Sequence, residues 1–597
     1  MTAEPRPEIR RVGLGVSAGI AFGRAYLIGR DTLKAPRHHI ETDDIDTEIA
    51  RLYKAIAASD KQLAKIKDKL KSENESDYHI ISAHQMMLHD EHFVGAAVAY
   101  IRDDKLNAEW GLRKAVDDIS SVFDNIEDAY LRERKSDVEF VFERVLRNLL
   151  GRVAGPLAPP SDAVVVAYDL SPADTALLHK AAVAGLITDA GGKTSHTAII
   201  ARAHEIPSVV ALENITELVE SGDLLVIDGT TGVVIVNPSP TTVADYRDEQ
   251  RRQLAAGMHL QAMRDVPPRL RDDVDLSLVA NIDGPDELEA ALDYGAMGVG
   301  LFRTEYLFMS GDLPDEERHY RTATAVLDKL KGKPATIRTF DLGADKLAKF
   351  VEQANLDEAN PALGLRSIRL CLSNLGKDLF RAQLRGLLRA SAHGPLKLMF
   401  PMISGVAELR AVRVFVDEVK AELRTEGVAF DEAMKLGIMI EMPSAALVAD
   451  LLARECDFFS IGTNDLIQYA LAVDRVNEYV SYLYEPLHPS VIRLIAMVVA
   501  GARAANIPVS VCGEMAGEPM IASVLVGLGI RELSMSAVSI PEVKDAVRRM
   551  TIAETENLVA RIQALTTAVE VRAIVSDYMF GIADPVVEHG LSTPTKA

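Results

Sequence analysis

The stretch LSLVANIDGPDELEAALDYGAMGVGLFRTE, residues 276–305, decides the fold of the larger part of this chain. It predicts a strand over Leu276–Ile282, a helical segment, and a second strand over Gly298–Phe302. The same alternation of strand-like and helix-like segments continues downstream, which is typical of a parallel sheet with crossover helices. Six further strands bring the expected number to eight, and eight predict a closed (β/α)₈ barrel of the TIM type.

The six further strands are short and apolar. They are expected at Ala335–Phe340, Gly364–Arg366, Lys397–Pro401, Gly437–Glu441, Phe458–Ile461 and Val509–Val511. In barrels of this type the catalytic residues lie at the C-terminal ends of the strands. Polar side chains that follow these segments are therefore the candidate site residues.

Arginines follow the second, third and fourth expected strands, at Arg303, Arg338 and Arg366. A guanidinium binds phosphate or carboxylate through paired hydrogen bonds and keeps its charge, so three at one rim suit a small, multiply charged anion. Rim arginines also pair with acids for purely structural reasons. Glu305 and Asp341 are available as such partners, and the two interpretations carry equal weight for any one arginine.

Two carboxylates end the sixth and seventh expected strands, at Glu441 and Asp465. Together with substrate oxygens and water they would form a hard oxygen site that fits six-coordinate Mg²⁺. Either acid alone is as commonly a helix cap or an ion-pair partner. Arg475 follows closely enough to reach the same rim. Cys512 ends the eighth strand, where its thiol could act as an acid or base toward a carbon centre.

A second informative stretch is GGKTSHTAIIAR, Gly191–Arg202. It predicts a glycine turn, Ser195 as N-cap, and a helix that begins at His196. Unpaired N–H groups and the positive end of the helix dipole meet there, so an anion is favoured and the imidazole tends to stay neutral and nucleophilic. The alternative interpretation is that His196 is an ordinary polar residue after a glycine turn. Lys193 could sit near phosphate or be solvated.

Strand-like segments flank a long helical block in the N-terminal part. Strands are expected within Val12–Ile28 and at 163–167, 186–189, 208–212 and 223–236, whereas 43–150 shows amphipathic helical spacing. The helical block therefore interrupts an α/β unit built from both flanks. A charged helical stretch, Thr242–Met263, ends at two prolines and is interpreted as the connector to the barrel.

Bulk composition narrows the function classes. The chain has 597 residues, a formal net charge of −22 and three widely spaced cysteines. The charge argues against a nucleic-acid or anionic-membrane surface and permits a basic protein partner. No secretory signal, transmembrane run, metal-finger pattern or disulfide framework is expected, so the predicted compartment is the cytoplasm.

The histidine stretch closely resembles the phosphohistidine segment of enzyme I of the bacterial phosphotransferase system, pyruvate phosphate dikinase and phosphoenolpyruvate synthase. GLFRTE, IRTFDLGADK, NPALGLRSIR, IEMPSA, FFSIGTNDLIQYALAVDR and VCGEMAG resemble the phosphoenolpyruvate-binding barrel of enzyme I in order and spacing. The resemblance implies phosphoryl transfer from phosphoenolpyruvate to His196 with release of pyruvate, and then to a histidine of the phosphocarrier protein HPr or a paralogue. It implies Mg²⁺ on Glu441 and Asp465, and protonation of the enolate by Cys512. It assigns substrate binding to Arg303, Arg338, Arg366, Asn464 and Arg475.

The resemblance also implies a domain organisation and a homodimer formed through the barrel. The expected domains are 1–32 with 151–240 (phosphohistidine α/β domain), 33–150 (all-helical, carrier-binding insertion), 241–266 (helical hinge), 267–580 (phosphoenolpyruvate-binding barrel) and 581–597 (polar tail). Ser171 would dock the resting imidazole. Met86, Met87, Leu88 and Phe93 form either a docking patch or part of the helical core.

Two alternatives remain at this point. A fragment of a dikinase or synthase shares the histidine segment and the barrel, but it needs an ATP-binding domain, and no glycine-rich ATP loop precedes His196. A non-catalytic scaffold that senses phosphoenolpyruvate would not need His196, Glu441, Asp465 and Cys512 together. The sequence does not distinguish a sugar-uptake pathway from a nitrogen-regulatory one.

Overall fold

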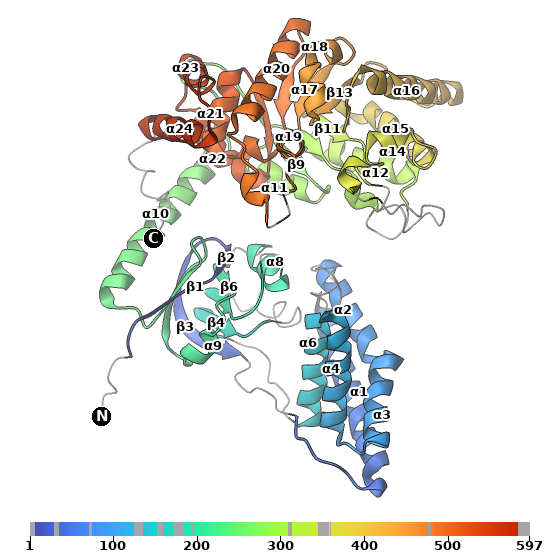
Figure 1. Ribbon diagram of the computed structural model, residues 1–597, viewed down its shortest axis with the longest axis vertical. Helices are drawn as coiled ribbons and strands as arrows, with labels where there is room; N and C mark the ends of the chain where they lie inside the picture. The colour runs from blue at the N-terminus through green and yellow to red at the C-terminus, as the bar shows by residue number, and fades with distance from the viewer. Residues whose placement is uncertain are drawn as a thin grey trace. The chain divides into compact units, whose positions relative to one another are not determined.

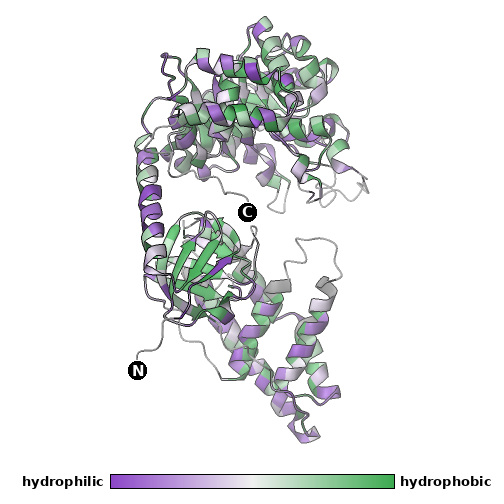
Figure 2. Cartoon of the chain, turned by 60° about the vertical axis from the view of Figure 1, so that its left-hand side comes forward, coloured by the Kyte–Doolittle hydropathy of each residue, from purple (hydrophilic) through white to green (hydrophobic). Residues whose placement is uncertain are grey.

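The structure is a computed structural model that describes residues 6–28, 35–70, 75–124, 135–151, 159–170, 183–192, 195–203, 206–308, 313–343, 358, 360–475, 477 and 479–582. The chain divides into two compact units, Met1–Leu254 and Ala255–Ala597. The boundary falls within helix α10 (Pro240–Ala262), whose residues are mostly hydrophilic (Figure 2). No described helix is long and apolar enough to cross a lipid bilayer.

The first unit contains an eight-stranded mixed sheet with the order β1-β8-β7-β3-β4-β5-β6-β2 (Figure 1). Strands β3 to β6 run parallel to one another, and the outer strands pair antiparallel. The bounds are β1 (Ile9–Val12), β2 (Leu14–Ser17), β3 (Ile20–Ile28), β4 (Ala163–Ala167), β5 (Gly185–Thr188), β6 (Ser208–Val210), β7 (Leu224–Asp228) and β8 (Val233–Val236). Continuous runs such as AVVVA in β4 are buried throughout, as expected for strands covered on both faces.

The chain leaves this sheet after β3 and returns at β4, its parallel neighbour. The helices between them are α1 (Ile45–Leu70), α2 (Glu75–Leu88), α3 (Glu91–Asp103), α4 (Ala108–Asp124) and α6 (Lys135–Leu149). Their apolar faces meet in one core that includes Leu52, Leu63, Leu112 and Val145. The predicted helical insertion into an α/β unit is confirmed. Within the predicted patch Met86 is exposed and Leu88 fully buried, while the side chain of Phe93 lies outside the described part.

The second unit is built on a closed barrel of eight parallel strands, which confirms the predicted fold class. The strands are β9 (Ser277–Ile282), β10 (Val299–Phe302), β11 (Ala335–Arg338), β12 (Leu396–Phe400), β13 (Lys435–Ile440), β14 (Phe458–Ile461), β15 (Val509–Val511) and β16 (Glu532–Met535). Leucine, isoleucine, valine and phenylalanine from strands and helices form one continuous core around them.

One of the eight expected strands is wrong. Gly364–Arg366 is irregular backbone that makes a single isolated bridge, between Gly343 and Arg366. The missing strand is β16, which closes the barrel by pairing with β15 and β9. Glu441 and Asp465 therefore follow the fifth and sixth strands of the barrel, and Cys512 follows the seventh, one place earlier than expected.

Helices cover the outside of the barrel (Figure 1). They are α11 (Glu287–Asp293), α12 (Glu316–Leu330), α14 (Ile368–Leu372), α15 (Lys377–Ala390), α16 (Val406–Glu426), α17 (Pro443–Leu447), α18 (Ala449–Leu452), α19 (Thr463–Leu471), α20 (Pro489–Ala505), α21 (Pro519–Leu528), α22 (Ile540–Val547), α23 (Ile552–Ile562) and α24 (Ala568–Ile582). In the first unit two further helices are α8 (His196–Ala203) and α9 (Ile215–Leu218).

Candidate active site

Helix α8 begins at the candidate phosphoryl acceptor, His196. The Oγ atom of Ser195 accepts a hydrogen bond from the amide of Ala198 at 3.3 Å, so the predicted N-cap is confirmed. Gly191 has φ +108°, a conformation that glycine adopts without strain, as the predicted turn requires. Lys193 and Ser171 lie outside the described residues. The backbone thus places His196 in the first helical turn, where a negative charge is favoured.

Two arginines share one buried carboxylate at the C-terminal rim of the barrel. Arg338 ends β11, and its Nη1 lies 3.1 Å from Asp341 Oδ2. Arg366 donates to both oxygens of Asp341, each at 3.0 Å. The Nη2 atom of Arg338 also donates to Glu305 Oε1 at 2.8 Å. We call these four residues the arginine cluster. The pairing of these arginines with acids is therefore confirmed, because the acids hold the guanidinium groups at the rim, and anion binding stays a prediction.

Charge compensation in the arginine cluster is strong. Burial alone would lower the pKa of Arg338, but the carboxylates of Glu305 and Asp341 outweigh it and raise that pKa above its ordinary value. Burial opposes ionisation of Asp341 too, and Arg338 and Arg366 nevertheless lower its pKa. Arg338, Arg366 and Asp341 are therefore charged at neutral pH.

Glu441 lies directly after β13 and is almost fully buried. Its Oε1 atom accepts a hydrogen bond from the amide of Met402 at 2.5 Å. Burial, followed by the negative charges of Asp341 and Asp465, raises the pKa of Glu441 well above its ordinary value. A Cβ atom at Gly462 would lie 3.0 Å from Glu441 Oε2, so the glycine leaves open the space beside this oxygen.

The donor set at the rim fits a hard divalent cation. Glu441 and Asp465 offer carboxylate oxygens, and Asp465 is linked to the arginine cluster by Arg366 Nη2 at 3.2 Å. In the described part of the chain, no three acidic, histidine or cysteine side chains are arranged as a complete metal site. The remaining ligands would be substrate and water oxygens, which is usual for Mg²⁺.

The other predicted binding residues lie in two further groups at the rim. Asn464 Nδ2 donates a hydrogen bond to Glu514 Oε1 at 3.0 Å. In return, the backbone amide of Glu514 donates to Asn464 Oδ1 at 2.9 Å. Arg475 Nη1 lies 4.0 Å from the same Glu514 carboxylate and stays partly exposed. Arg303 pairs with Asp283 at 3.2 Å and is also partly exposed. These exposed arginines keep donors available for a ligand.

Cys512 follows β15 and is 2% exposed. Burial and the negative charge of Glu441 raise the pKa of its thiol to about 11, a shift that Arg338 and Arg303 oppose by favouring the thiolate. Asn281 Nδ2 donates to the Cys512 carbonyl at 2.9 Å and thereby fixes the backbone. The thiol is therefore protonated at neutral pH.

Sequence comparisons agree with this arrangement. Residues 12–134, 159–232 and 258–552 match the PEP-utilising enzyme N-terminal, mobile and PEP-binding domains. The phosphoenolpyruvate-protein phosphotransferase of Lactococcus lactis subsp. lactis is 41% identical over 571 residues, 95% of this chain and 99% of its own length. The chain belongs to the phosphoenolpyruvate-protein phosphotransferase family. Further members of this family, from Enterococcus faecalis and Bacillus subtilis, are 40% and 39% identical over the same shares of both chains.

Family membership confirms the predicted resemblance. Among the described residues, Arg366 contacts Asp465 directly and is joined to Arg338 through Asp341. Asn464 and Arg475 share Glu514 as a partner. Sequence reasoning missed the role of Glu514 as a shared partner. Its position two residues after Cys512 was the available signal.

Two tyrosines were also missed. Tyr469 accepts a hydrogen bond from Arg366 Nη1 at 3.2 Å, and Tyr484 donates to the carbonyl of Asn464 at 3.3 Å. Tyr469 stands four residues after Asp465 on α19, one helical turn away, and this spacing was a usable signal. Tyr484 lies 20 residues from its partner, and nothing in the local pattern points to it.

Proposed function

We propose that this chain transfers the phosphoryl group of phosphoenolpyruvate to His196, releases pyruvate, and then passes the phosphoryl group to a histidine of HPr or a paralogue. One observation supports this most: buried arginines and carboxylates share the C-terminal rim of the barrel, in a chain with a helix that begins at His196. The relatives are named for phosphoryl transfer from phosphoenolpyruvate to protein, and 95% of this chain matches them.

The arginines bind and orient the substrate in this proposal. Arg338 and Arg366 are already fixed by Asp341, so they offer positive charge without rearranging. Arg303 and Arg475 are more exposed and would bind the anion on the side that faces solvent. Asn464 contributes its side-chain amide. Phosphate and carboxylate of the substrate both suit this set, since guanidinium and amide groups donate paired hydrogen bonds.

His196 attacks the phosphorus atom in line with the bridging oxygen. The new N–P bond forms as the P–O bond breaks, and the electron pair of the broken bond stays on the enolate oxygen. The transition state is loose, so positioning and charge neutralisation supply most of the rate enhancement. Collapse of the enolate to pyruvate needs a proton at carbon, and the neutral thiol of Cys512 supplies it.

Family membership indicates a divalent metal ion, and we propose Mg²⁺ held by Glu441 and Asp465. When bound, the ion would neutralise charge on phosphate and enolate oxygens. Gly462 keeps the second oxygen of Glu441 accessible, and Met402 fixes the first.

The assignment of functions to segments rests on the same proposal. The helical insertion 33–150 would receive the carrier protein, segment 241–266 would act as the hinge that lets His196 visit two partners, and the barrel 267–580 would form the homodimer. Residues 1–32 with 151–240 would carry the phosphohistidine, and 581–597 would be a tail. Cytoplasmic localisation, the homodimer and the choice between HPr and a nitrogen-pathway paralogue stay predictions.

Labelled phosphoenolpyruvate tests the proposal. With Mg²⁺ present, the wild type should acquire acid-labile label and release pyruvate, whereas His196→Ala should acquire none. His89→Ala, which removes an exposed histidine of the helical insertion, serves as the matched control and should label fully. Addition of purified carriers should discharge the label onto one of them. Full labelling of His196→Ala would refute the assignment of the acceptor.

A further inference from the structure

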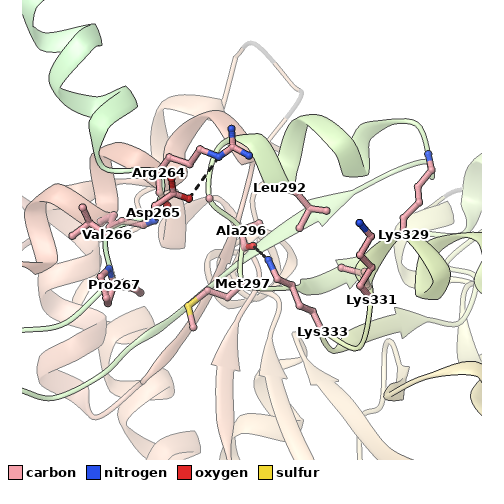
Figure 3. A pocket seen from close by; sticks show the side chains of 14 residues that line it. Arg264, Asp265, Val266, Pro267, Leu292, Ala296, Met297, Lys329, Lys331 and Lys333 are labelled. Atoms are coloured by element: carbon pink, nitrogen blue, oxygen red, sulfur yellow. Dashed lines mark hydrogen bonds and ion pairs between the residues drawn. The ribbon is translucent and has the colours of Figure 1, made fainter.

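A cavity of about 540 Å³ lies at the N-terminal end of the barrel, at the opposite end of the strands from the arginine cluster (Figure 3). Apart from Lys544, which lies on α22, its lining residues precede strands rather than follow them. Arg264–Pro268 lead into β9, Gly295–Met297 precede β10, and Lys329–Lys333 precede β11. The cavity is therefore separate from the candidate active site.

Five cationic side chains line this cavity, which we call the basal pocket: Arg264, Lys329, Lys331, Lys333 and Lys544. Three of the ammonium groups donate to neutral carbonyl oxygens. Lys333 donates to Ala296 at 3.1 Å, as Figure 3 shows, and Lys329 donates to Pro285 at 3.0 Å. The nearly buried Lys544 donates to the carbonyls of Met263 at 3.1 Å and Arg264 at 2.8 Å. These hydrogen bonds hold the lysines but do not neutralise their charge, and Asp265, which also lines the pocket, attracts only Lys544 among them.

Carboxylates are scarce around the basal pocket. Arg264 pairs with Asp293 at 2.9 Å and with the highly exposed Asp265 at 3.9 Å. Among the described residues, Lys331 has no partner for its ammonium group. Elsewhere on the same unit arginines such as Arg385 bind two or three carboxylates. A local excess of positive charge in a chain with a net charge of −22 is therefore a specific feature of this pocket.

Part of the lining of the basal pocket is apolar. Val266, Pro267, Leu292 and Met297 lie among its lining residues, and Met297 is 42% exposed. Figure 3 shows Met297 and Pro267 on the side of the pocket away from Lys329 and Lys331. A volume of this size falls in the usual range of small-molecule sites. A ligand that fits both walls carries a compact, multiply charged anion at one end and a carbon skeleton at the other.

We propose that the basal pocket binds a small organic phosphate. Lysine ammonium groups are compact point charges that suit a phosphate dianion, and three of them follow one another closely in the segment 329–333. The carbon skeleton of the ligand would lie against Met297 and the prolines. Because the pocket contacts Arg264 directly after α10, a bound ligand would also restrain the segment that joins this helix to the barrel. The proposal does not depend on the reaction at the arginine cluster.

Binding is measured by calorimetry on the full chain at 150 mM salt, with glucose 6-phosphate, adenosine 5′-monophosphate, inorganic phosphate and citrate as probes. We expect at least one of the two organic phosphates to bind more tightly than inorganic phosphate and citrate. Lys331→Asn should weaken that binding about tenfold, and Lys331→Asn with Lys333→Gln about a hundredfold, because each lysine contributes a charge-assisted hydrogen bond. Lys105→Asn is the matched control, since Lys105 shares the left-handed φ of Lys331 and lies outside the pocket. It should leave affinity unchanged.

Hydrogen exchange locates the bound probe. Protection of amides in 263–266 and 329–333 supports the proposal, whereas protection confined to the rim segments 303–308 and 338–343 overturns it. Absence of binding, affinity unchanged in both lysine variants, or tighter binding of citrate than of either organic phosphate also overturns it. Labelling of His196 by phosphoenolpyruvate is measured in parallel. Its failure would contradict the proposed function and would leave the result for the basal pocket standing.

Discussion

Asp341→Asn tests whether the buried carboxylate holds the arginine cluster together. The carboxylate lies within 3.1 Å of one nitrogen of Arg338 and at 3.0 Å from two nitrogens of Arg366, and its side chain is 3% exposed. Removal of one partner from a buried ion pair costs about 3–5 kcal/mol. Asparagine keeps one acceptor oxygen, so we expect the lower end, a loss of about 3 kcal/mol in the free energy of unfolding of the barrel.

The single tryptophan makes this measurement selective. Trp110 lies on α4 in the first unit, so its fluorescence in urea should be unchanged by the substitution, while the loss of far-UV circular dichroism from the barrel shifts to lower urea. Asp273→Asn is the matched control because Asp273 is 88% exposed and its left-handed φ suits asparagine. A loss below about 1 kcal/mol in Asp341→Asn would refute the reasoning, since exposed pairs typically contribute that little.

Three further predictions concern single side chains. Gly462→Ala should destabilise the barrel by about 1–3 kcal/mol and lower the labelling rate, because its Cβ would lie 2.9 Å from Met439 Sδ and 3.0 Å from Glu441 Oε2. Gly405→Ala, with open space around it, should change neither. Burial lowers the pKa of His319 to about 4, and both ring nitrogens lack a described partner. The unfolded chain therefore binds a proton that the folded state does not, and the free energy of unfolding falls by up to about 3 kcal/mol as pH falls from 6.5 toward 4. His319→Phe should flatten that part of the stability curve, and an unchanged curve would contradict this origin. The rate of alkylation of Cys512, followed by mass spectrometry, should be low at pH 8 and rise about tenfold per pH unit toward pH 10. The reason is that only the thiolate reacts and burial raises the pKa of the thiol to about 11. A rate that levels off below pH 9 would exclude this pKa.

Alternating segments were enough to predict the barrel, but they were not enough to identify every strand. Gly364–Arg366 looked like a strand because it is short and lies between two helical stretches. Its backbone instead makes one bridge and then bends at Ser367, which has φ +58°. The strand β16 was missed because half of ELSM is polar and because it follows an almost wholly apolar helix, so no apolar run marks it as a strand. Closure of the barrel requires a strand that pairs with both β15 and β9, and only β16 does so among the described strands. This pairing joins segments far apart in the sequence, so local patterns do not reveal it.

The site shows the same division between local and long-range information. The sequence correctly indicated that Glu305 and Asp341 are partners for arginines, because short loops after neighbouring strands meet at one rim. It could not indicate that Glu441 would accept a hydrogen bond from Met402, a residue with φ +57° whose conformation depends on the surrounding packing. Residue types thus carried the chemistry, and tertiary packing determined the geometry.

The connection between β3 and β4 has an evolutionary consequence. These neighbouring strands pair in parallel, from Arg24 with Ala163 to Ile28 with Ala167. The whole helical insertion lies within the one connection between them. A parallel crossover requires only about a dozen residues. The helical block can therefore be exchanged or shortened at its two junctions with the sheet without disturbing the ladder on either side, which would let descendants of one ancestral sheet acquire different helical inserts.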